Sequence, residues 1–237
     1  MKREGSLPIT RIASYVLCAI ALQGPVFPAT PEISAMTPSA DVVSLPAPRL
    51  DSRVSVEQVL RSRRSVREFR KAPIALTEVA QLLWAAQGVT HGDGFRTAPS
   101  AGALYPLELY LIAGEVTGLS AGVYWYEPGK NQLLKILDGD LRTPLAHAAL
   151  DQSWIGDAAA VLAFAAVPER TTRKYGERGI RYIHMEIGHA AQNVLLEAVA
   201  LDLGTAVVGA FVDEQVHTLL QLPKDQPVLY LIPVGKP

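Results

Sequence analysis

The first stretch whose residue types could do chemistry is a basic run around one serine, Arg63-Arg64-Ser65-Val66-Arg67. Its guanidinium groups and its hydroxyl place many hydrogen-bond donors close together. Guanidinium groups bind phosphates and carboxylates through paired N–H donors. The run therefore indicates an anion site. The alternative is a solvated basic surface, where such clusters are also common.

Three more segments combine small residues with proline or glycine. The segment 99–106 (PSAGALYP) gives a stiff path whose backbone can approach a flat ligand closely, or it is a plain connection from a loop to a strand. In the run 206–211 (AVVGAF), Gly209 can let a backbone N–H face a ligand atom. The last segment is the terminal stretch 233–237 (PVGKP), which contains Lys236.

The longest helical pattern in the chain runs from 183 to 203. Apolar residues recur there at steps of three and four, which predicts a helix buried in a core or a subunit interface. Gly204 stands where a helix-ending glycine is expected, and a buried strand is expected after it. Four polar residues interrupt the apolar pattern and are poorly explained by a core role alone, namely Glu186, His189, Gln192 and Asn193.

His184 and His189 flank Glu186, which raises the question of a metal site. A separation of five residues leaves two side chains about 140° apart around a helix, so the imidazoles do not share a face. We therefore expect no metal, and we expect buried polar residues of the long helix instead.

The rest of the chain alternates helical and strand patterns, with a hairpin around Pro128-Gly129. Expected helices are 55–63, 77–88 with Thr77 as its cap, 140–150 and 213–220. Expected strands are 107–113, 123–126, 132–137, 158–167 and 228–234, and 170–181 is expected to be a basic connection. This order predicts an α+β fold in which helices flank a mixed central sheet.

Composition fits a globular chain with a substantial core, because 49% of its 237 residues are hydrophobic and 19% are charged. The net charge of -1 gives no electrostatic reason to expect nucleic acid as a partner. Cys18 is the sole cysteine, so an intramolecular disulfide is excluded.

The first residues resemble a targeting segment, since basic residues precede the apolar run Ile12–Leu22. We expect residues 1–30 to be a signal peptide or, if uncleaved, a membrane anchor. The Pro-rich residues 31–52 are expected to form a tether, and 53–237 to form the folded domain. The domain would then be exported, either periplasmic or anchored and facing away from the cytoplasm.

In their order and spacing, the four segments described above resemble the FMN-dependent nitroreductase family, over about Val54 to Pro237. The strings PSAGALYPLELY and KYGERGIRYIHMEIGHAAQN resemble more narrowly the SagB/thiazole-forming dehydrogenase branch, which oxidises peptide azolines to azoles. The resemblance implies a nitroreductase-like fold and a homodimer with the long helix at its interface.

The resemblance also assigns roles to individual residues. The FMN phosphate and ribityl chain would contact Arg63, Arg64, Ser65 and Arg67, with Lys236 as a further phosphate contact. Pro99, Ser100, Ala101 and Gly102 would line the flavin ring, and Val208, Gly209 and Ala210 would lie near its N5 atom. Ala103 departs from the family, many members of which have an asparagine near the ring.

Lys174-Tyr175 occupies the position of the catalytic Lys-Tyr pair of that branch. Such a pair would remove a proton from the substrate carbon, and the surrounding arginines would favour the deprotonated form of either group. A solvated basic loop is the alternative. The expected function is FMN-dependent dehydrogenation of a thiazoline, an oxazoline or a related small or peptidic substrate. The alternatives are an NAD(P)H-dependent nitro or quinone reductase and a non-catalytic flavin-binding protein.

Overall fold

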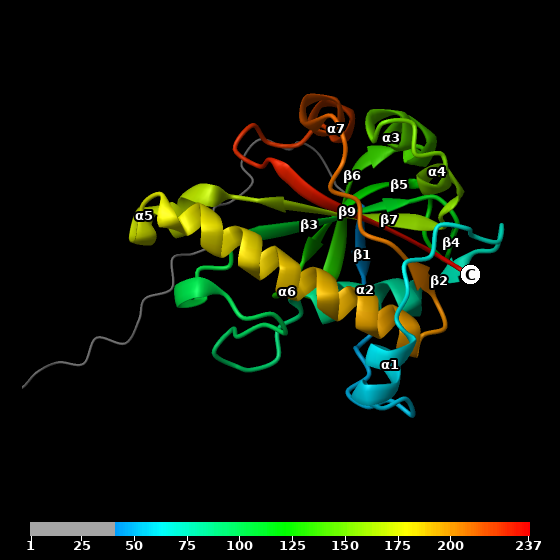
Figure 1. Ribbon diagram of the computed structural model, residues 1–237, viewed down its shortest axis with the longest axis horizontal. Coiled ribbons are helices and arrows are strands. Elements are labelled where there is room, and N and C mark those ends of the chain that lie inside the picture. The colour runs from blue at the N-terminus through cyan, green and yellow to red at the C-terminus, as the bar shows by residue number, and fades with distance from the viewer. Residues whose placement is uncertain (1–40) are drawn as a thin grey trace, which may run out of the picture. The chain divides into compact units, whose positions relative to one another are not determined.

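The computed structural model describes residues 41–237, which are built around a seven-stranded sheet (Figure 1). Its strand order is β1-β6-β5-β3-β7-β9-β8, and every neighbouring pair is antiparallel. The strands are β1 (Val42–Ser44), β3 (Leu107–Ala113), β5 (Gly122–Glu127), β6 (Gln132–Asp138), β7 (Ala160–Ala166), β8 (Gly204–Thr205) and β9 (Val228–Gly235). Two short strands, β2 (Ile74–Ala75) and β4 (Val116–Thr117), pair in parallel beside it.

Helices cover both faces of the sheet (Figure 1). They are α1 (Val56–Ser62), α2 (Leu76–Gln87), α3 (Arg142–Ala148), α4 (Trp154–Asp157), α5 (Pro168–Tyr175), α6 (Arg178–Ala200) and α7 (Asp213–Leu220). Residues of α2 and α6 pack in one hydrophobic cluster, and residues of α3, α4 and α7 pack in another. The predicted α+β fold with a helix-flanked sheet is confirmed, although the central sheet expected to be mixed is antiparallel throughout and the parallel pair β2-β4 lies beside it.

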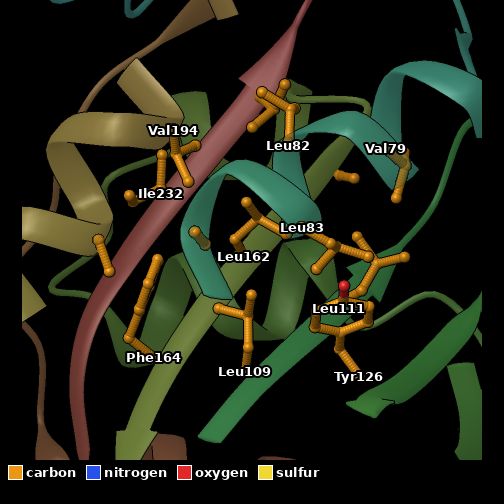
Figure 2. Close-up of a cluster of buried hydrophobic side chains, with 14 of the residues drawn as sticks. Val79, Leu82, Leu83, Leu109, Leu111, Tyr126, Leu162, Phe164, Val194 and Ile232 are labelled. Carbon is orange, nitrogen blue, oxygen red and sulfur yellow. The ribbon is translucent and has the colours of Figure 1, made fainter. Parts of the chain in front are cut away.

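The two cores follow from the alternation of side chains along buried strands. In β7, Leu162 and Phe164 belong to the cluster under α2 and α6, whereas Val161 and Ala163 belong to the cluster under α3, α4 and α7. Figure 2 shows the first cluster, where Leu83 of α2 lies over the strand side chains. Because β7 is buried on both faces, its sequence is apolar without a break.

Several expected elements are confirmed at nearly the expected residues. Ser55 caps α1 in a capping box with Gln58, each side chain bonding the other residue's backbone N–H. β5 and β6 form the expected hairpin. Thr77 as the cap of the second helix is wrong. The N-cap is Ala75, whose N–H donates to the Glu78 carboxylate over 2.7 Å.

The expected basic connection at 170–181 is also wrong, because most of it is helical. Pro168 opens α5, where a missing N–H costs nothing. Gly176, with a φ of +57°, separates α5 from α6. The run of charged residues hid a short helix whose exposed face carries those charges.

Gly204 does not end α6, which stops at Ala200. Asp202 takes the positive φ of +55° there, and the Leu203 N–H donates to the Ala198 carbonyl over 2.8 Å. A Cβ on Gly204 would lie 2.7 Å from Val66 Cγ1, so this glycine permits a close approach of two segments. The strand expected over 206–211 is reduced to one bridge, between Val208 and Leu231.

The part of the expected tether that the structure describes, from residue 41 on, is not free of the domain. Val42–Ser44 forms β1 and pairs with β6, and Leu45 is buried. Prolines allow this because they follow the short strand instead of interrupting its pairing. The signal peptide expected at 1–30 lies outside the described residues. Within 41–237, no helix is long and apolar enough to cross a membrane.

Candidate active site

Two of the predicted segments meet at Gly102. This glycine has a φ of +65° in a short 3-10 turn, Ala101–Ala103. A Cβ placed on it would lie 2.8 Å from Tyr175 Oη and 3.0 Å from Lys174 Nζ, so both side chains pack against the turn. We call the residues that meet here the Gly102 cluster: Pro99, Ser100, Ala101, Gly102, Lys174 and Tyr175.

Lys174 and Tyr175 are the last two residues of α5. The Tyr175 ring meets the Tyr182 ring of α6 in a T-shaped contact with 5.1 Å between centroids. The Lys174 ammonium lies 5.4 Å from the centroid of the Tyr175 ring. Lys174 is exposed and Tyr175 is half-buried, so the pair is open to a ligand on one side and supported on the other.

A buried carboxyl, Glu186 of α6, lies behind the Gly102 cluster. The Ser100 hydroxyl donates to Glu186 Oε2 over 2.6 Å and accepts from the Tyr105 N–H over 2.9 Å. Only 3% of Glu186 is exposed, and its Oε1 atom has no hydrogen-bond partner among residues 41–237. Burial raises the pKa of Glu186 to about 7, while the Ser100 hydrogen bond and the charge of Arg96 act in the opposite direction.

A buried ion pair ties α5 to the sheet. The Glu108 carboxylate of β3 accepts from Arg170 Nη2 over 2.5 Å and from Trp125 Nε1 over 2.6 Å. Arg170 also donates to the Tyr105 carbonyl over 3.1 Å. Arg170 therefore joins three elements, namely α5, β3 and the 99–106 segment, and fixes the helix that carries Lys174 and Tyr175.

Arg96 completes this group of charges. Its guanidinium lies 4.5 Å from the centroid of the Tyr105 ring and donates to Gln87 Oε1 over 2.9 Å. Burial lowers the pKa of Arg96, whereas attraction by Glu108 and Glu186 acts to raise it. The wall behind the Gly102 cluster is thus built from charged groups of both signs in close contact.

The predicted anion site lies elsewhere, where the chain leaves α1 and runs beside β8. Ser65 forms a parallel bridge with Thr205, and the Val66 N–H donates to the Thr205 carbonyl over 2.9 Å. We call Arg63, Arg64, Ser65 and Arg67 the arginine cluster. Arg63 is half-buried, and the other three residues are exposed.

The guanidinium groups of this cluster have few acidic partners close by. Arg64 Nη1 donates to the carbonyls of Arg61 and Arg63, over 2.9 and 2.8 Å, at the end of α1. The Arg67 guanidinium lies 5.7 Å from the centroid of a Trp154 ring. These are weak surface contacts that a stronger anionic ligand can replace.

The segment expected near flavin N5 follows β8 directly. Val208 is buried and bridged to the sheet, whereas Gly209 and Ala210 are exposed. Lys236 is placed differently from the expectation, since its ammonium bonds to the Glu78 carboxylate of α2 over 2.6 Å. Its charge is therefore already paired, and its role as a phosphate contact stays a prediction.

The structure thus gathers most of the predicted residues into two groups at opposite ends of α6, while Val208, Gly209, Ala210 and Lys236 belong to neither. The Gly102 cluster lies with α5, which precedes the helix, and the arginine cluster lies with α1 and β8, which adjoin its far end (Figure 1). A helix of this length spans about 35 Å at 1.5 Å per residue. Between the two ends, the exposed face of α6 includes Ile180 and Met185.

A hollow of about 550 Å³ lies along the first turns of α6. Its lining combines basic and apolar side chains with one acidic residue, namely Glu177, Arg178, Ile180, Arg181 and His184. The hollow is close in sequence to Lys174-Tyr175, and its two arginines could hold an acidic group of a ligand.

Sequence reasoning missed the buried charges of the site. Arg96 and Glu108 gave no sequence signal, because their contacts join segments far apart in the chain. Arg170 was expected only as one of the arginines around Lys174-Tyr175, and its pairing with Glu108 was not predicted. Glu186 did give one, since it interrupts the apolar pattern of α6. Asn193, another of those interruptions, donates to the Thr97 carbonyl over 3.4 Å, so both residues hold the loop that leads into the Gly102 cluster.

Residues 60–236 match the model of the nitroreductase family. A presumed nitroreductase of Methanocaldococcus jannaschii, MJ1384, is 48% identical over 196 residues, which cover 83% of this chain and 98% of that protein. The trifolitoxin operon protein TfxC of Rhizobium leguminosarum is 27% identical over 192 residues, which cover 74% of this chain and 54% of TfxC. The microcin B17-processing protein McbC of Escherichia coli is 30% identical over 138 residues, or 55% of this chain and 50% of McbC.

Solved structures show the same fold. A presumed nitroreductase from Anabaena variabilis matches with a TM-score of 0.75 and 31% identity, over 84% of this chain and 42% of that one. The NADPH:FMN oxidoreductase of Vibrio harveyi matches with a TM-score of 0.56 and 21% identity, over 77% of this chain and 68% of that one. The chain therefore spans only about half the length of TfxC and McbC, and less than half of the Anabaena protein.

Proposed function

The chain belongs to the nitroreductase family of oxidoreductases, and we propose that it is an FMN-dependent dehydrogenase of a thiazoline, an oxazoline or a related small or peptidic substrate. The observation that carries this proposal is the packing of Lys174 and Tyr175 against Gly102. A pair of proton-transfer groups there touches the segment assigned to the flavin ring. The similarity to McbC and TfxC, whose names refer to microcin processing and to a trifolitoxin operon, supports a substrate of this kind.

The residues fit a bound FMN. Pro99–Gly102 presents small side chains, with Lys174 and Tyr175 over the Cβ side of Gly102. A Cβ on exposed Gly209 would meet only Tyr230, at 3.6 Å, so the Gly209 backbone is not blocked from a flat ring. The arginine cluster offers guanidinium donors suited to a phosphate. When bound, FMN supplies a hydride acceptor at its N5 atom.

Lys174 and Tyr175 would handle the proton that leaves the substrate carbon. The Tyr175 oxygen and the Lys174 nitrogen both approach Gly102, so either can accept a proton in the same small space. The Glu108–Arg170 ion pair fixes the position of α5, so that Lys174 and Tyr175 stay against Gly102. Proton removal beside the flavin-lining segment is the step that distinguishes an azoline oxidase from a simple reductase.

We propose that the active form is a homodimer. The two clusters lie at opposite ends of α6, and a second copy packed along this helix could bring its arginine cluster to the Gly102 cluster of the first. Exposed apolar residues on two helices support such an interface: Ile180 and Met185 on α6, and Val56 and Leu60 on α1.

We also propose that the domain works outside the cytoplasmic membrane, on the strength of the basic and apolar pattern of residues 1–30. If these residues stay attached, they would anchor the domain. Fractionation of cells that express the full chain tests this, and a purely cytoplasmic protein would contradict it.

A second candidate is an NAD(P)H-dependent nitro or quinone reductase, which the similarity to MJ1384 over nearly its whole length favours. A third, a flavin-binding protein without catalysis, would leave Lys174 and Tyr175 without a role. The two enzymes differ in their dependence on a carbon-bound proton. Only the dehydrogenase needs a base at the Gly102 cluster.

The test begins with the visible absorption spectrum of the purified protein and identification of any chromophore released on denaturation. Bound FMN supports the cofactor assignment, and a folded protein that refuses added FMN contradicts it. The loaded protein is then offered a thiazoline peptide and, separately, NADPH with a nitroaromatic. Faster turnover of the thiazoline supports the leading function, and turnover of the nitroaromatic alone supports the second candidate.

A further inference from the structure

The proposed mechanism gives no role to Glu186, a buried carboxyl in direct contact with the Gly102 cluster. It is 3% exposed, and its Oε1 atom has no hydrogen-bond partner in the part of the chain that the structure describes. Buried carboxylate oxygens are normally satisfied, because an unpaired one loses its hydration without compensation. A carboxyl held in this way favours its neutral form, with a proton on one oxygen.

Ser100 is the link between this carboxyl and the ligand side of the cluster. Its hydroxyl has one proton to donate and two lone pairs that accept. One lone pair takes the Tyr105 N–H over 2.9 Å, and the proton goes to Glu186 over 2.6 Å. The remaining lone pair is left for a ligand, so Ser100 can act only as an acceptor while Glu186 is ionised.

Protonation of Glu186 reverses this arrangement. The carboxyl then donates its own proton to Ser100 Oγ, and the hydroxyl proton of Ser100 turns away from Glu186. The Tyr105 N–H still donates to the other lone pair of Ser100 Oγ, so the bonds of Ser100 to Tyr105 and to Glu186 persist in both states, while Glu186 Oε1 has no partner among the described residues in either. The hydroxyl next to Gly102 changes from an acceptor to a donor, without movement of the backbone.

We propose that Glu186 is a positioning residue that stores a proton and sets whether Ser100 accepts from a bound flavin or donates to it. The assignment of Ser100 to the flavin-lining segment rests on the proposed function, whereas the coupling of Ser100 to Glu186 does not. The proton comes from and returns to solvent, so no other reactant is needed.

The charges around Glu186 are compatible with titration near neutrality. Burial raises its pKa to about 7, and the Ser100 hydrogen bond and nearby Arg96 act against that rise. Arg96 in turn is flanked by the Glu108–Arg170 ion pair. The other titratable groups close to Ser100 belong to the same wall and the same turn: Tyr105, with Lys174 and Tyr175 over Gly102.

The first test uses the flavin-free protein. The native carboxyl keeps its proton up to pH about 7, whereas the unfolded chain releases it near 4.5, so folding takes up a proton between these values. The contribution of Glu186 to stability is therefore full below about pH 4.5 and is lost as pH rises toward 7. As the pH rises from 5 to 8, the melting temperature of the wild type should fall by several degrees relative to that of Glu186→Gln. If the two proteins give parallel curves of melting temperature against pH, the proposal is overturned.

A second variant tests the link to Ser100 without any ligand. The Ser100 hydrogen bond favours the ionised carboxyl, so Ser100→Ala should move the inflection of the stability curve to higher pH. An inflection at the wild-type pH would mean that Ser100 does not sense the charge of Glu186. Glu197→Gln is the matched control, because Glu197 lies on the same helix and is half-buried but does not bond to Ser100.

The last measurement is the dissociation constant of FMN between pH 5.5 and 8.5, divided by that of Glu186→Gln at the same pH, because the FMN phosphate itself titrates at about pH 6. A ratio that changes near neutrality for the wild type and for Glu197→Gln, but not for Ser100→Ala, supports the effect on the ligand. A ratio that also changes for Ser100→Ala, or that is constant for the wild type, overturns it. Failure of the wild type to bind FMN at any pH would contradict the proposed function, while the melting curves would still decide whether Glu186 and Ser100 are coupled.

Discussion

The Gly102 cluster and the arginine cluster differ in how the protein holds their side chains. Behind Gly102, charges of both signs are buried and in contact, and Lys174 and Tyr175 rest on a glycine turn. In the arginine cluster, most side chains are exposed and bond mainly to backbone carbonyls and an aromatic ring. The first region is organised before any ligand arrives, as proton transfer requires, and the second offers charge that a ligand can organise.

The largest effect is expected when both side chains over Gly102, those of Lys174 and Tyr175, are removed. Lys174→Ala together with Tyr175→Ala should lower the rate of azoline oxidation by about 10²-fold or more, since general-base catalysis contributes that much. FMN binding should persist, because the guanidinium groups proposed to bind its phosphate are unchanged. Lys130→Ala, at the exposed turn between β5 and β6, serves as the control and should keep its rate. Unchanged turnover in the double variant would remove the pair from the mechanism.

The Glu108–Arg170 ion pair, which supports the Gly102 cluster, should also contribute to the stability of the fold. Arg170→Met leaves the Glu108 carboxylate, only 8% exposed, without its charge partner. We expect a loss of about 3 kcal/mol, or roughly 6–12 °C in melting temperature. Arg173→Met, which removes an exposed pair with Glu169, should shift the melting temperature far less. Equal shifts in the two variants would show that the pair is not a structural support.

Gly102→Ala tests the contact of Gly102 with Lys174 and Tyr175, because Gly94 offers a control glycine with a similar backbone conformation. Gly94 also has a positive φ, of +79°, but a Cβ there would meet nothing within 4 Å. Each alanine should lower the free energy of unfolding by about 1 kcal/mol, because alanine disfavours a positive φ. Only Gly102→Ala should displace Lys174 and Tyr175, and we expect it to slow azoline oxidation by about tenfold beyond Gly94→Ala. Equal rates would mean that the contact over Gly102 has no catalytic value.

The smallest effect on the fold is expected from the arginine cluster. Arg67→Ala should weaken FMN binding by about tenfold, a typical loss for one charge-assisted contact, and should leave the melting temperature of the flavin-free protein nearly unchanged. Isothermal titration and thermal melting measure the two quantities. Arg53→Ala, an exposed arginine before α1, is the control. An unaltered dissociation constant would exclude Arg67 as a phosphate contact.

Local patterns were sufficient to predict most of the fold. The mostly apolar sequence of β3, the unbroken apolar run of β7 and the capping box of α1 depend on residues close in sequence. β1 and α5 were missed for the opposite reason. A three-residue strand exists only because β6 is available to pair with it, and α5 is a charged helix fixed by the distant Glu108.

The candidate site was also only partly predictable from the sequence. Family resemblance selected its residues, but which of them contact one another depends on tertiary structure. That Lys174 and Tyr175 touch Gly102 requires α5 to fold back over the turn, and nothing in their spacing indicates this. The position of Lys236 was not predictable either, because its partner Glu78 lies far away in the sequence, on α2, where it also caps the helix.

The pairing of β1 with β6 has a consequence for handling the protein. Without Val42–Ser44, the backbone N–H and C=O groups of β6 that face β1 would be an unprotected sheet edge, which invites pairing between molecules. A chain shortened to begin at residue 45 should therefore aggregate more readily than one beginning at 39. The strand that looked like the end of a linker thus works as a cover against self-association.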